Sequence, residues 1–123
     1  MKTSRQISEQ RGRRAEFWAA IYLGLKGYRV RARRFRSRRG EIDLICKRGK
    51  WVVFVEVKTR KTVGDAVYSI AYKQRKRIEA ASEDWLKRHP AIRGSLRFDV
   101  IAIVPWQFPT HIKDAWRPEA RPY

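Results

Sequence analysis

The stretch that decides the fold is "GEIDLICKRGKWVVFVEVKTR", residues 40–60. Its two apolar runs, residues 41–47 and 51–59, are rich in β-branched side chains and flank the tripeptide "RGK", a pattern typical of a β-hairpin around Gly49. The run "VVFVEV" is so continuously apolar that both faces of its strand should be covered. We therefore place this second strand at the centre of a sheet.

Three of the chain's acidic side chains lie in the same stretch: Glu41, Asp43 and Glu56. Side chains two residues apart on a strand share a face, so Glu56 and Lys58 should point the same way as Phe54. The central strand is thus expected to display a carboxylate and an amine side by side. Glu41, at the very start of the first run, could be a further ligand, but the favoured interpretation is that it is solvated or paired with Arg39.

The register of the hairpin decides whether Asp43 joins Glu56. A two-residue loop of Arg48 and Gly49 would pair Asp43 with Phe54 and put its side chain on the face of Glu56. An odd loop or a β-bulge would break this register. Two carboxylates that converge at the centre of a strand are unfavourable unless a positive charge lies between them, because like charges repel and burial penalises each of them.

Lys58 supplies one such charge, and a hard divalent cation would supply the rest, which makes Asp43 and Glu56 candidate ligands of Mg²⁺ or Mn²⁺. A metal ion of this kind polarises a phosphoryl oxygen and lowers the pKa of a bound water, and a neighbouring lysine can orient that water. Glu16, within an amphipathic helical pattern, is a further candidate that spacing alone does not place. The alternative is a cluster of structural salt bridges.

The charge of the chain points to a polyanionic partner. Thirty Lys and Arg residues against twelve Asp and Glu residues give a net charge of +18 and a pI of about 11.1. Such a field favours nucleic acid, with solubility alone as the alternative. The run 26–39, with eight Lys or Arg, leads directly into the candidate site. The expected nucleic-acid-binding residues are Arg29, Arg31, Arg33, Arg34, Arg36, Arg38, Arg39, Arg60, Lys73 and Lys76.

Outside the hairpin, periodicity predicts one α/β domain over residues 1–123. Its elements are a helix at 8–26, a basic strand at 28–36, the hairpin, a helix at 65–88 and a strand at 96–104. Residues 1–7 are read as a flexible basic arm. The proline-containing tail at 105–123 is expected to add at most a short edge strand at 111–116.

The single cysteine, Cys46, excludes an internal disulfide and a cysteine-based zinc site and is expected to pack as a small apolar residue. No amino-terminal apolar run indicates a signal peptide, and no stretch approaches the roughly 20 apolar residues of a membrane span. We therefore expect a cytoplasmic protein without a membrane partner. Asp99 is expected to pair with a nearby arginine, and neither His89 nor His111 is assigned a role as a ligand.

The tryptophans divide into two groups. Trp18, Trp51 and Trp85 lie within the periodic segments and are expected in the core. Trp106 and Trp116 lie in the tail, where they could stack on unpaired bases or pack over the edge of the sheet, and the sequence leaves both readings open.

Five segments in this order resemble the YraN-type family of predicted endonucleases: "GRRAEFWAAIYLGLKGYRV", "RRGEIDLI", "VVFVEVKTR", "YKQRKRIEAA" and "RFDVIAI". That family is assigned to the restriction-endonuclease-like PD-(D/E)XK superfamily, with archaeal Holliday-junction resolvases as relatives. The resemblance covers most of residues 12–104. It implies an α-β-β-β-α-β core, with a mixed central sheet flanked by helices, and a metal-dependent nuclease site.

Carried over by position, the resemblance implies five catalytic residues: Glu16, Asp43, Glu56, Lys58 and Gln74. Asp43 and Glu56 are the implied ligands of Mg²⁺ or Mn²⁺, and Gln74 matches a helical glutamine that lies near the site in related nucleases. The superfamily motif has a proline directly before its aspartate, whereas this chain has Ile42 before Asp43. The family itself commonly has "GEIDLI" at this place.

The function expected from these features is cleavage of phosphodiester bonds in DNA, with branched or structured DNA favoured. A non-catalytic nucleic-acid-binding or ribosome-associated module on the same fold is the alternative, and a protein adaptor that uses the tail is a third reading. By analogy with junction resolvases a homodimer is expected, because a symmetric four-way substrate suits two sites.

Overall fold

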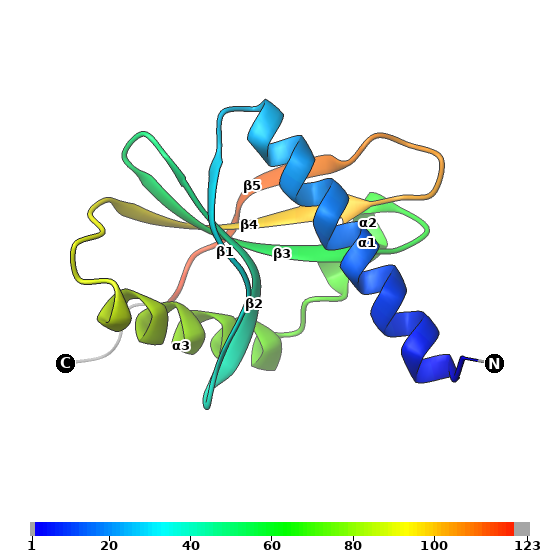
Figure 1. Ribbon diagram of the computed structural model, residues 1–123, viewed down its shortest axis with the longest axis horizontal. Coiled ribbons are helices and arrows are strands. Elements are labelled where there is room, and N and C mark those ends of the chain that lie inside the picture. Colours follow the sequence, from blue (N-terminus) through cyan, green and yellow to red (C-terminus); the bar gives the residue numbers. More distant parts are fainter. Residues whose placement is uncertain (1, 120–123) are drawn as a thin grey trace.

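The computed structural model describes residues 2–119. Its elements in chain order are α1 (Ser4–Leu25), β1 (Arg29–Ser37), β2 (Gly40–Arg48), β3 (Trp51–Thr59), α2 (Val63–Tyr68), α3 (Tyr72–Arg88), β4 (Ser95–Ile103) and β5 (Thr110–Trp116). The strands form one sheet in the order β1-β2-β3-β4-β5, in which only β3 and β4 run parallel. The fold is the expected α/β architecture, with a mixed sheet flanked by helices (Figure 1).

Two apolar clusters fill the two faces of the sheet. On one face, Ala19 and Leu23 of α1 pack against Val53 and Val55 of β3. On the other face, Trp85 of α3 and its neighbours pack against Val52 and Phe54. The alternation predicted for β3 is confirmed, and the strand lies at the centre of the sheet with both faces covered.

The first helix begins four residues earlier than predicted, so the arm expected at 1–7 is wrong for residues 4–7. The hydroxyl of Thr3 accepts a hydrogen bond from the backbone N–H of Gln6, and Oε1 of Gln6 accepts one from the N–H of Thr3. This reciprocal capping box satisfies amide groups that a helix start leaves without partners. The basic composition of this segment led to the prediction of an arm, although a well-capped helix begins here. Met1 lies outside the described residues.

The helix predicted at 65–88 is divided into α2 and α3. Thr62 caps α2 through a hydrogen bond from the N–H of Asp65, and the backbone at Ala71 is extended just before α3 begins. Between the two helices Ile70 is buried in the α3-side cluster. A continuous helix was predicted because the apolar spacing persists across the turn.

The β2–β3 hairpin is tight and shifted by one residue from the prediction. Its loop is Gly49–Lys50, with Arg48 paired to Trp51, and Gly49 adopts a φ of 55°. A left-handed conformation at the first loop residue suits two-residue hairpins. Glycine therefore occupies the first loop position, residue 49, and Lys50 occupies the second. The predicted pairing of Asp43 with Phe54 is therefore wrong, because Phe54 pairs with Ile45. The loop still has two residues, so the faces are unchanged.

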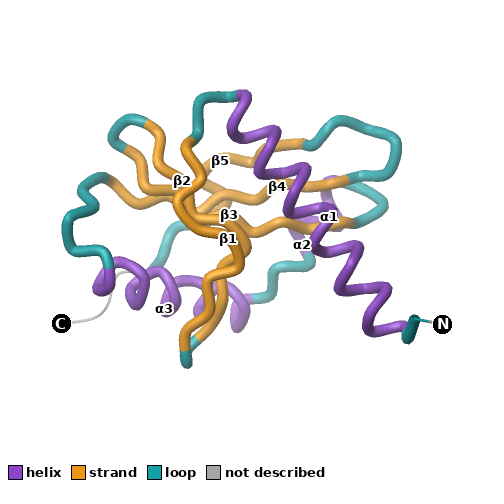
Figure 2. The backbone as a smooth tube through the Cα atoms, viewed as in Figure 1, coloured by secondary structure: helices purple, strands orange, loops and turns teal. Residues whose placement is uncertain are grey.

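The β1–β2 ribbon turns away from β3 and runs down beside α3 (Figures 1 and 2). Its ladder has an irregularity between Val30 and Ala32, and Arg34 has a φ of 51° within the strand. At the far end, a Cβ on Gly40 would clash with the backbone carbonyl oxygen of Arg77 in α3. Glycine is thus required where the ribbon touches the helix.

The tail forms β5, which confirms the edge strand expected at 111–116. Trp116 is buried in the core and stacks on Phe98 with ring centroids 5.3 Å apart. Trp18 is 59% exposed, contrary to expectation, because the buried stripe of α1 runs through Ala15 and Ala19. Residues 120–123 of the predicted tail lie outside the described part of the chain. Within residues 2–119, no helix is both long and apolar enough to cross a bilayer.

Candidate active site

Asp43 lies where β2 separates from β3. The last ladder pair of the two strands is Leu44 with Val55, one residue before the split. Beyond it, Oδ2 of Asp43 accepts a hydrogen bond of 2.8 Å from the backbone N–H of Val57. The carboxylate thus replaces the strand partner that Val57 loses, and this bond holds Asp43 beside the buried carboxylate of Glu56.

Glu56, Lys58 and Gln74 form a closed triangle. The amide Nε2 of Gln74 donates to Oε1 of Glu56 at 3.0 Å, and the amide Oε1 accepts from Nζ of Lys58 at 3.4 Å. The third side is the ion pair between Nζ of Lys58 and Oε1 of Glu56, also 3.4 Å. Gln74 comes from the first turn of α3, so the helix positions both site residues of β3.

Both carboxyl groups have strongly raised pKa values. Burial raises the pKa of Asp43 to about 6, with the negative charge of Glu16 adding to the effect and Lys58 opposing it. Burial also raises the pKa of Glu56 to about 8, with the charge of Asp43 adding to it. Two acids that resist ionisation next to each other form a site that a cation stabilises.

Glu16 reaches the same region from α1. It is buried, and its Oε2 lies 2.7 Å from Nε of Arg34 in an ion pair without the alignment of a hydrogen bond. Arg34 is the residue with the left-handed φ in β1. Glu16, which spacing alone did not place, thus points inward. Arg34, predicted to contact phosphate, instead lies against this carboxylate.

Two adjoining hollows open over these side chains. One has a volume of about 280 Å³ and is lined by Glu41, Asp43, Glu56, Gln74, Arg77 and Ile78. The other has a volume of about 500 Å³ and extends between α1 and the end of β3, past Arg11, Glu16, Lys58 and Arg60. Asp43, Glu56 and Gln74 line both. The structure therefore brings all five predicted site residues together in one open region.

The donor set fits a hard divalent cation with much of its hydration shell. Among residues 2–119, no three His, Cys, Asp or Glu side chains lie close enough to form a metal site by themselves. Mg²⁺ is commonly held by one or two carboxylates and several waters, so Asp43 and Glu56 are a sufficient protein contribution. Burial is the main cause of the raised pKa values of both groups, and a cation bound between them would oppose it.

Residues 15–103 match the model of "Uncharacterised protein family UPF0102". The chain belongs to this family. It is 50% identical to the UPF0102 protein of Mesorhizobium japonicum over 92% of this chain and 91% of the relative. It is 47% identical to that of Agrobacterium fabrum over 91% and 93%, and 49% identical to that of Bartonella bacilliformis over 91% and 93%. The UPF0102 span contains Glu16, Asp43, Glu56, Lys58 and Gln74.

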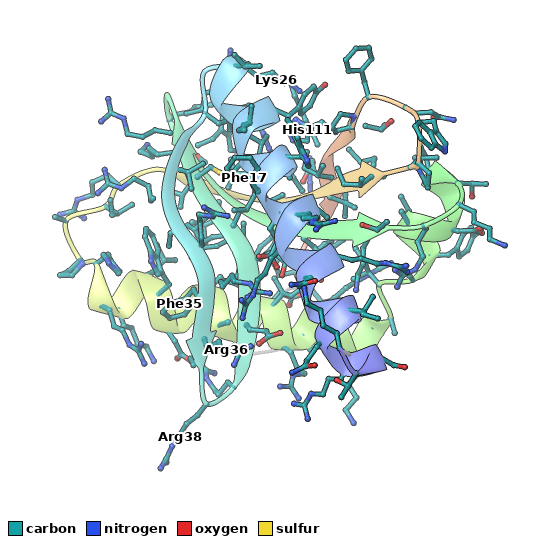
Figure 3. All side chains as sticks on the ribbon, turned by 45° about the vertical axis from the view of Figure 1, so that its right-hand side comes forward. Phe17, Lys26, Phe35, Arg36, Arg38 and His111 are labelled. Carbon is teal, nitrogen blue, oxygen red and sulfur yellow. The ribbon has the colours of Figure 1, made fainter. Side chains whose placement is uncertain are left out.

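The UPF0102 span also contains all the predicted nucleic-acid-binding residues. Those with exposed side chains are Arg29, Arg31, Arg33, Arg34, Arg36, Arg38, Arg39, Arg60 and Lys73, whereas Lys76 is partly buried. Figure 3 shows Arg38 projecting from the tip of the β1–β2 ribbon and Arg36 close to it.

Besides Arg34, three more of these residues are bound to acids. Arg36 pairs with Glu41 at 3.1 Å, so the predicted partner of Glu41 is wrong. Lys76 lies 3.4 Å from Glu79. Arg39 pairs instead with Glu83 and Asp84 of α3, at 3.1 and 2.7 Å, and fastens the ribbon to that helix.

Two groups of residues in this UPF0102 protein were not predicted from the sequence. Arg77 lines the smaller hollow, and its spacing of three residues from Gln74 on one helix was the available signal. His111 belongs to a buried cluster instead of standing alone. Its Nε2 lies 2.6 Å from Oδ2 of Asp99, and its Nδ1 lies 2.7 Å from Nζ of Lys26 (Figure 3). Asp99 also pairs with Arg97, as predicted for a nearby arginine.

Proposed function

We propose that this chain is a metal-dependent endonuclease that cleaves phosphodiester bonds in DNA, with branched or structured DNA as the favoured substrate. One observation carries the proposal. The buried carboxylate of Glu56 and the half-buried one of Asp43, both with raised pKa values, adjoin a lysine that Gln74 holds in place, and all four side chains belong to an open region of a strongly basic molecule. Nucleic acid is the polyanion that such a charge attracts most generally.

Asp43 and Glu56 would hold the Mg²⁺ or Mn²⁺ ion, assisted by Glu16 or by water that Glu16 contacts. When bound, such an ion polarises the phosphoryl oxygen and lowers the pKa of a coordinated water. Lys58 has three donor hydrogens, and its contacts with Glu56 and Gln74 fix where its ammonium lies. A donor on Lys58 can therefore orient the attacking water or stabilise charge that develops on the phosphate.

The surroundings of the site suit a substrate of high negative charge. Arg60 lines the larger hollow, and Arg29, Arg31 and Arg33 lie exposed along β1. Contacts from these side chains to phosphates would give affinity without sequence preference. We further propose that the enzyme acts in the cytoplasm as a homodimer, which would present two sites to a symmetric junction.

Asp43→Asn is the sharpest test, because an asparagine oxygen can still accept the N–H of Val57 while the negative charge is lost. We expect cleavage to fall by about a hundredfold or more, as for loss of a central charge-stabilising group. The assay compares labelled four-way junction, flap, single strand, duplex and structured RNA, each with Mg²⁺, Mn²⁺ or chelator. Asp65→Asn is the matched control, since it removes an exposed acid in the first turn of α2.

Undiminished, metal-dependent cleavage by Asp43→Asn would refute the assignment. One observation favours the alternative of a non-catalytic binding module: Lys58 and Gln74 provide Glu56 with an ion-pair partner and a hydrogen-bond donor from within the protein. Salt-sensitive binding to these substrates without products in either metal would establish that alternative. If products formed only from RNA, the proposed chemistry would stand and RNA would replace DNA as the substrate.

A further inference from the structure

A third hollow lies outside the candidate site, between α1 and the loop that joins β4 to β5. Its volume is about 620 Å³, and six of its lining residues carry the argument: Trp18, Ile21, Tyr22, Leu25, Trp106 and Phe108. The two segments that contribute most of the wall, residues 17–25 and 100–110, contain no charged residue, although 34% of the whole chain is charged. A surface so free of charge contrasts with the rest of this basic molecule.

The loop displays its aromatic side chains at a conformational cost. Trp106 is fully exposed, Phe108 is 91% exposed, and Trp106 has a φ of 65°, which is unfavourable for a residue other than glycine. Pro105 and Pro109 flank the pair and restrict the backbone on either side. Strain and exposed aromatic area in one short loop are characteristic of binding sites.

This aromatic hollow adjoins the candidate active site along two elements. Thr59 lines the larger site hollow, and its ladder partner on β4, Ile103, lines the aromatic hollow. The backbone N–H of Arg60 donates to the carbonyl of Ile103 at 3.2 Å. Along α1, Glu16 faces the active site and Trp18 faces the aromatic hollow. A ligand chain can thus pass from one to the other across the strand ends at Arg60.

We propose that unpaired bases of a single-stranded segment stack on Trp106 and Phe108, while the adjoining phosphates pass Arg60 toward Asp43. Phosphates require cations, which this wall lacks, but every base has an apolar face that stacks on aromatic rings. The net charge of +18 draws nucleic acid to the molecule, and this hollow adjoins the site that its phosphates would enter. The proposal deepens the proposed function, because it assigns single-stranded or branched substrates to the same site.

Binding in chelator tests the proposal without any cleavage. The probes are a labelled 20-nucleotide oligo(dT) and a labelled blunt 20-base-pair duplex, and anisotropy gives the dissociation constants. We expect Trp106→Ala to weaken binding of the single strand by at least about fivefold and to leave duplex binding within about twofold. Trp106→Phe should restore most of the loss, because it retains a ring. Tyr68→Ala, which removes an equally exposed aromatic of α2, is the matched control.

Equal weakening of both probes, or no weakening of the single strand, would overturn the proposal. So would a concentration-dependent dimer in light scattering that Trp106→Ala converts to monomer while single-strand binding is unchanged, because the occupant would then be a second copy. Neither probe is cleaved in chelator, so the dissociation constants do not depend on catalysis. A protein that cleaves nothing can therefore still confirm or refute base stacking. Failure of the base-stacking proposal and failure of the nuclease proposal are thus distinguishable.

Discussion

Gln74 positions Lys58 because the two ends of its amide have opposite polarity. The NH₂ end can only donate and meets the carboxylate of Glu56, whereas the oxygen can only accept and meets the ammonium of Lys58. A glutamate at 74 would place a third carboxylate beside Asp43 and Glu56, and an alanine would leave Lys58 without its second contact. The residue is thus suited to hold a lysine and a carboxylate at the same time.

The buried cluster around Asp99 leads to a prediction on acid stability. Burial by itself raises the pKa of Asp99, but hydrogen bonds from His111, Arg97 and the N–H of Asp114 outweigh it, so the pKa lies below its usual value. Lys26 can only donate, so Nδ1 of His111 accepts and Nε2 donates to Asp99. A carboxyl with a lowered pKa contributes stability above the ordinary pKa near 4, and that stability is lost as the pH falls through the lower value.

Asp99→Asn should therefore lower the free energy of unfolding at pH 7 by about 3 kcal/mol, because it leaves Arg97 buried without its counter-charge. The difference from the wild type should shrink as the pH falls below about 4. Urea unfolding at several pH values measures both effects. An unchanged midpoint at pH 7, or a difference that grows on acidification, would contradict the prediction.

At the scale of single residues, strand alternation together with a two-residue hairpin loop predicted the neighbourhood of Asp43, Glu56 and Lys58. It did not reveal the pairing of Glu16 with Arg34 or the role of His111, because both join segments far apart in sequence. Their positions depend on how α1 and β5 lie on the sheet, and no local period encodes that. The roles of these residues in catalysis stay predictions.

Among the elements, the β1–β2 ribbon shows how a glycine couples a hairpin to a helix. Gly40 begins β2 against the carbonyl of Arg77, and Gln74 lies one turn earlier on the same helix. Gly40→Ala should force the ribbon and α3 apart, because the nearest atoms belong to the backbone and cannot rotate away. We expect a loss of about 1–3 kcal/mol in the free energy of unfolding.

Thermal and urea unfolding would measure the Gly40→Ala loss, with Gly12→Ala on α1 as the control, since a Cβ there meets nothing within 4 Å. Gly12→Ala should be neutral or slightly stabilising, because alanine favours a helix. Equal stability of the two variants would show that the ribbon tolerates displacement from α3. A smaller cost at Gly40 than at Gly12 would contradict the packing argument outright.

Element types were predictable from sequence to a greater extent than element ends. The apolar runs of β2, β3 and β4 predicted the order of these elements along the chain and the central place of β3, and the resemblance implied the same chain order. The starts of α1 and α2 depended on capping by Thr3 and Thr62, whose hydroxyls act over a single turn, and the break before α3 depended on the extended backbone at Ala71. Periodicity measured over many residues does not resolve such local hydrogen bonds.

For the molecule as a whole, the charge predicts a steep salt dependence of nucleic-acid binding. Each phosphate that a cation neutralises on a duplex contributes about −0.9 to the slope of log K against log salt concentration. If Arg31 and Arg33 each contact a phosphate, the double variant Arg31→Ala/Arg33→Ala should reduce the magnitude of this slope by about 2. Titrations in chelator at several salt concentrations measure it.

Arg39→Ala is the matched control for the salt titration. Its guanidinium is occupied by Glu83 and Asp84, and its pKa is raised by these hydrogen bonds. It should leave the slope nearly unchanged and lower the melting temperature slightly. If Arg39→Ala alters the slope as much as the double variant does, phosphate contact is not concentrated on β1.

The position of β3 also has a consequence during synthesis. Its partner on one side, β2, is adjacent in sequence, but its parallel partner β4 is completed only at residue 103, after α2 and α3. Until then one edge of "VVFVEVK" is open, and an apolar strand edge without a partner can pair with another chain. Glu56 and Lys58 are the charges that interrupt this run. Neutralising both to remove the site would therefore create a nascent chain more prone to aggregate.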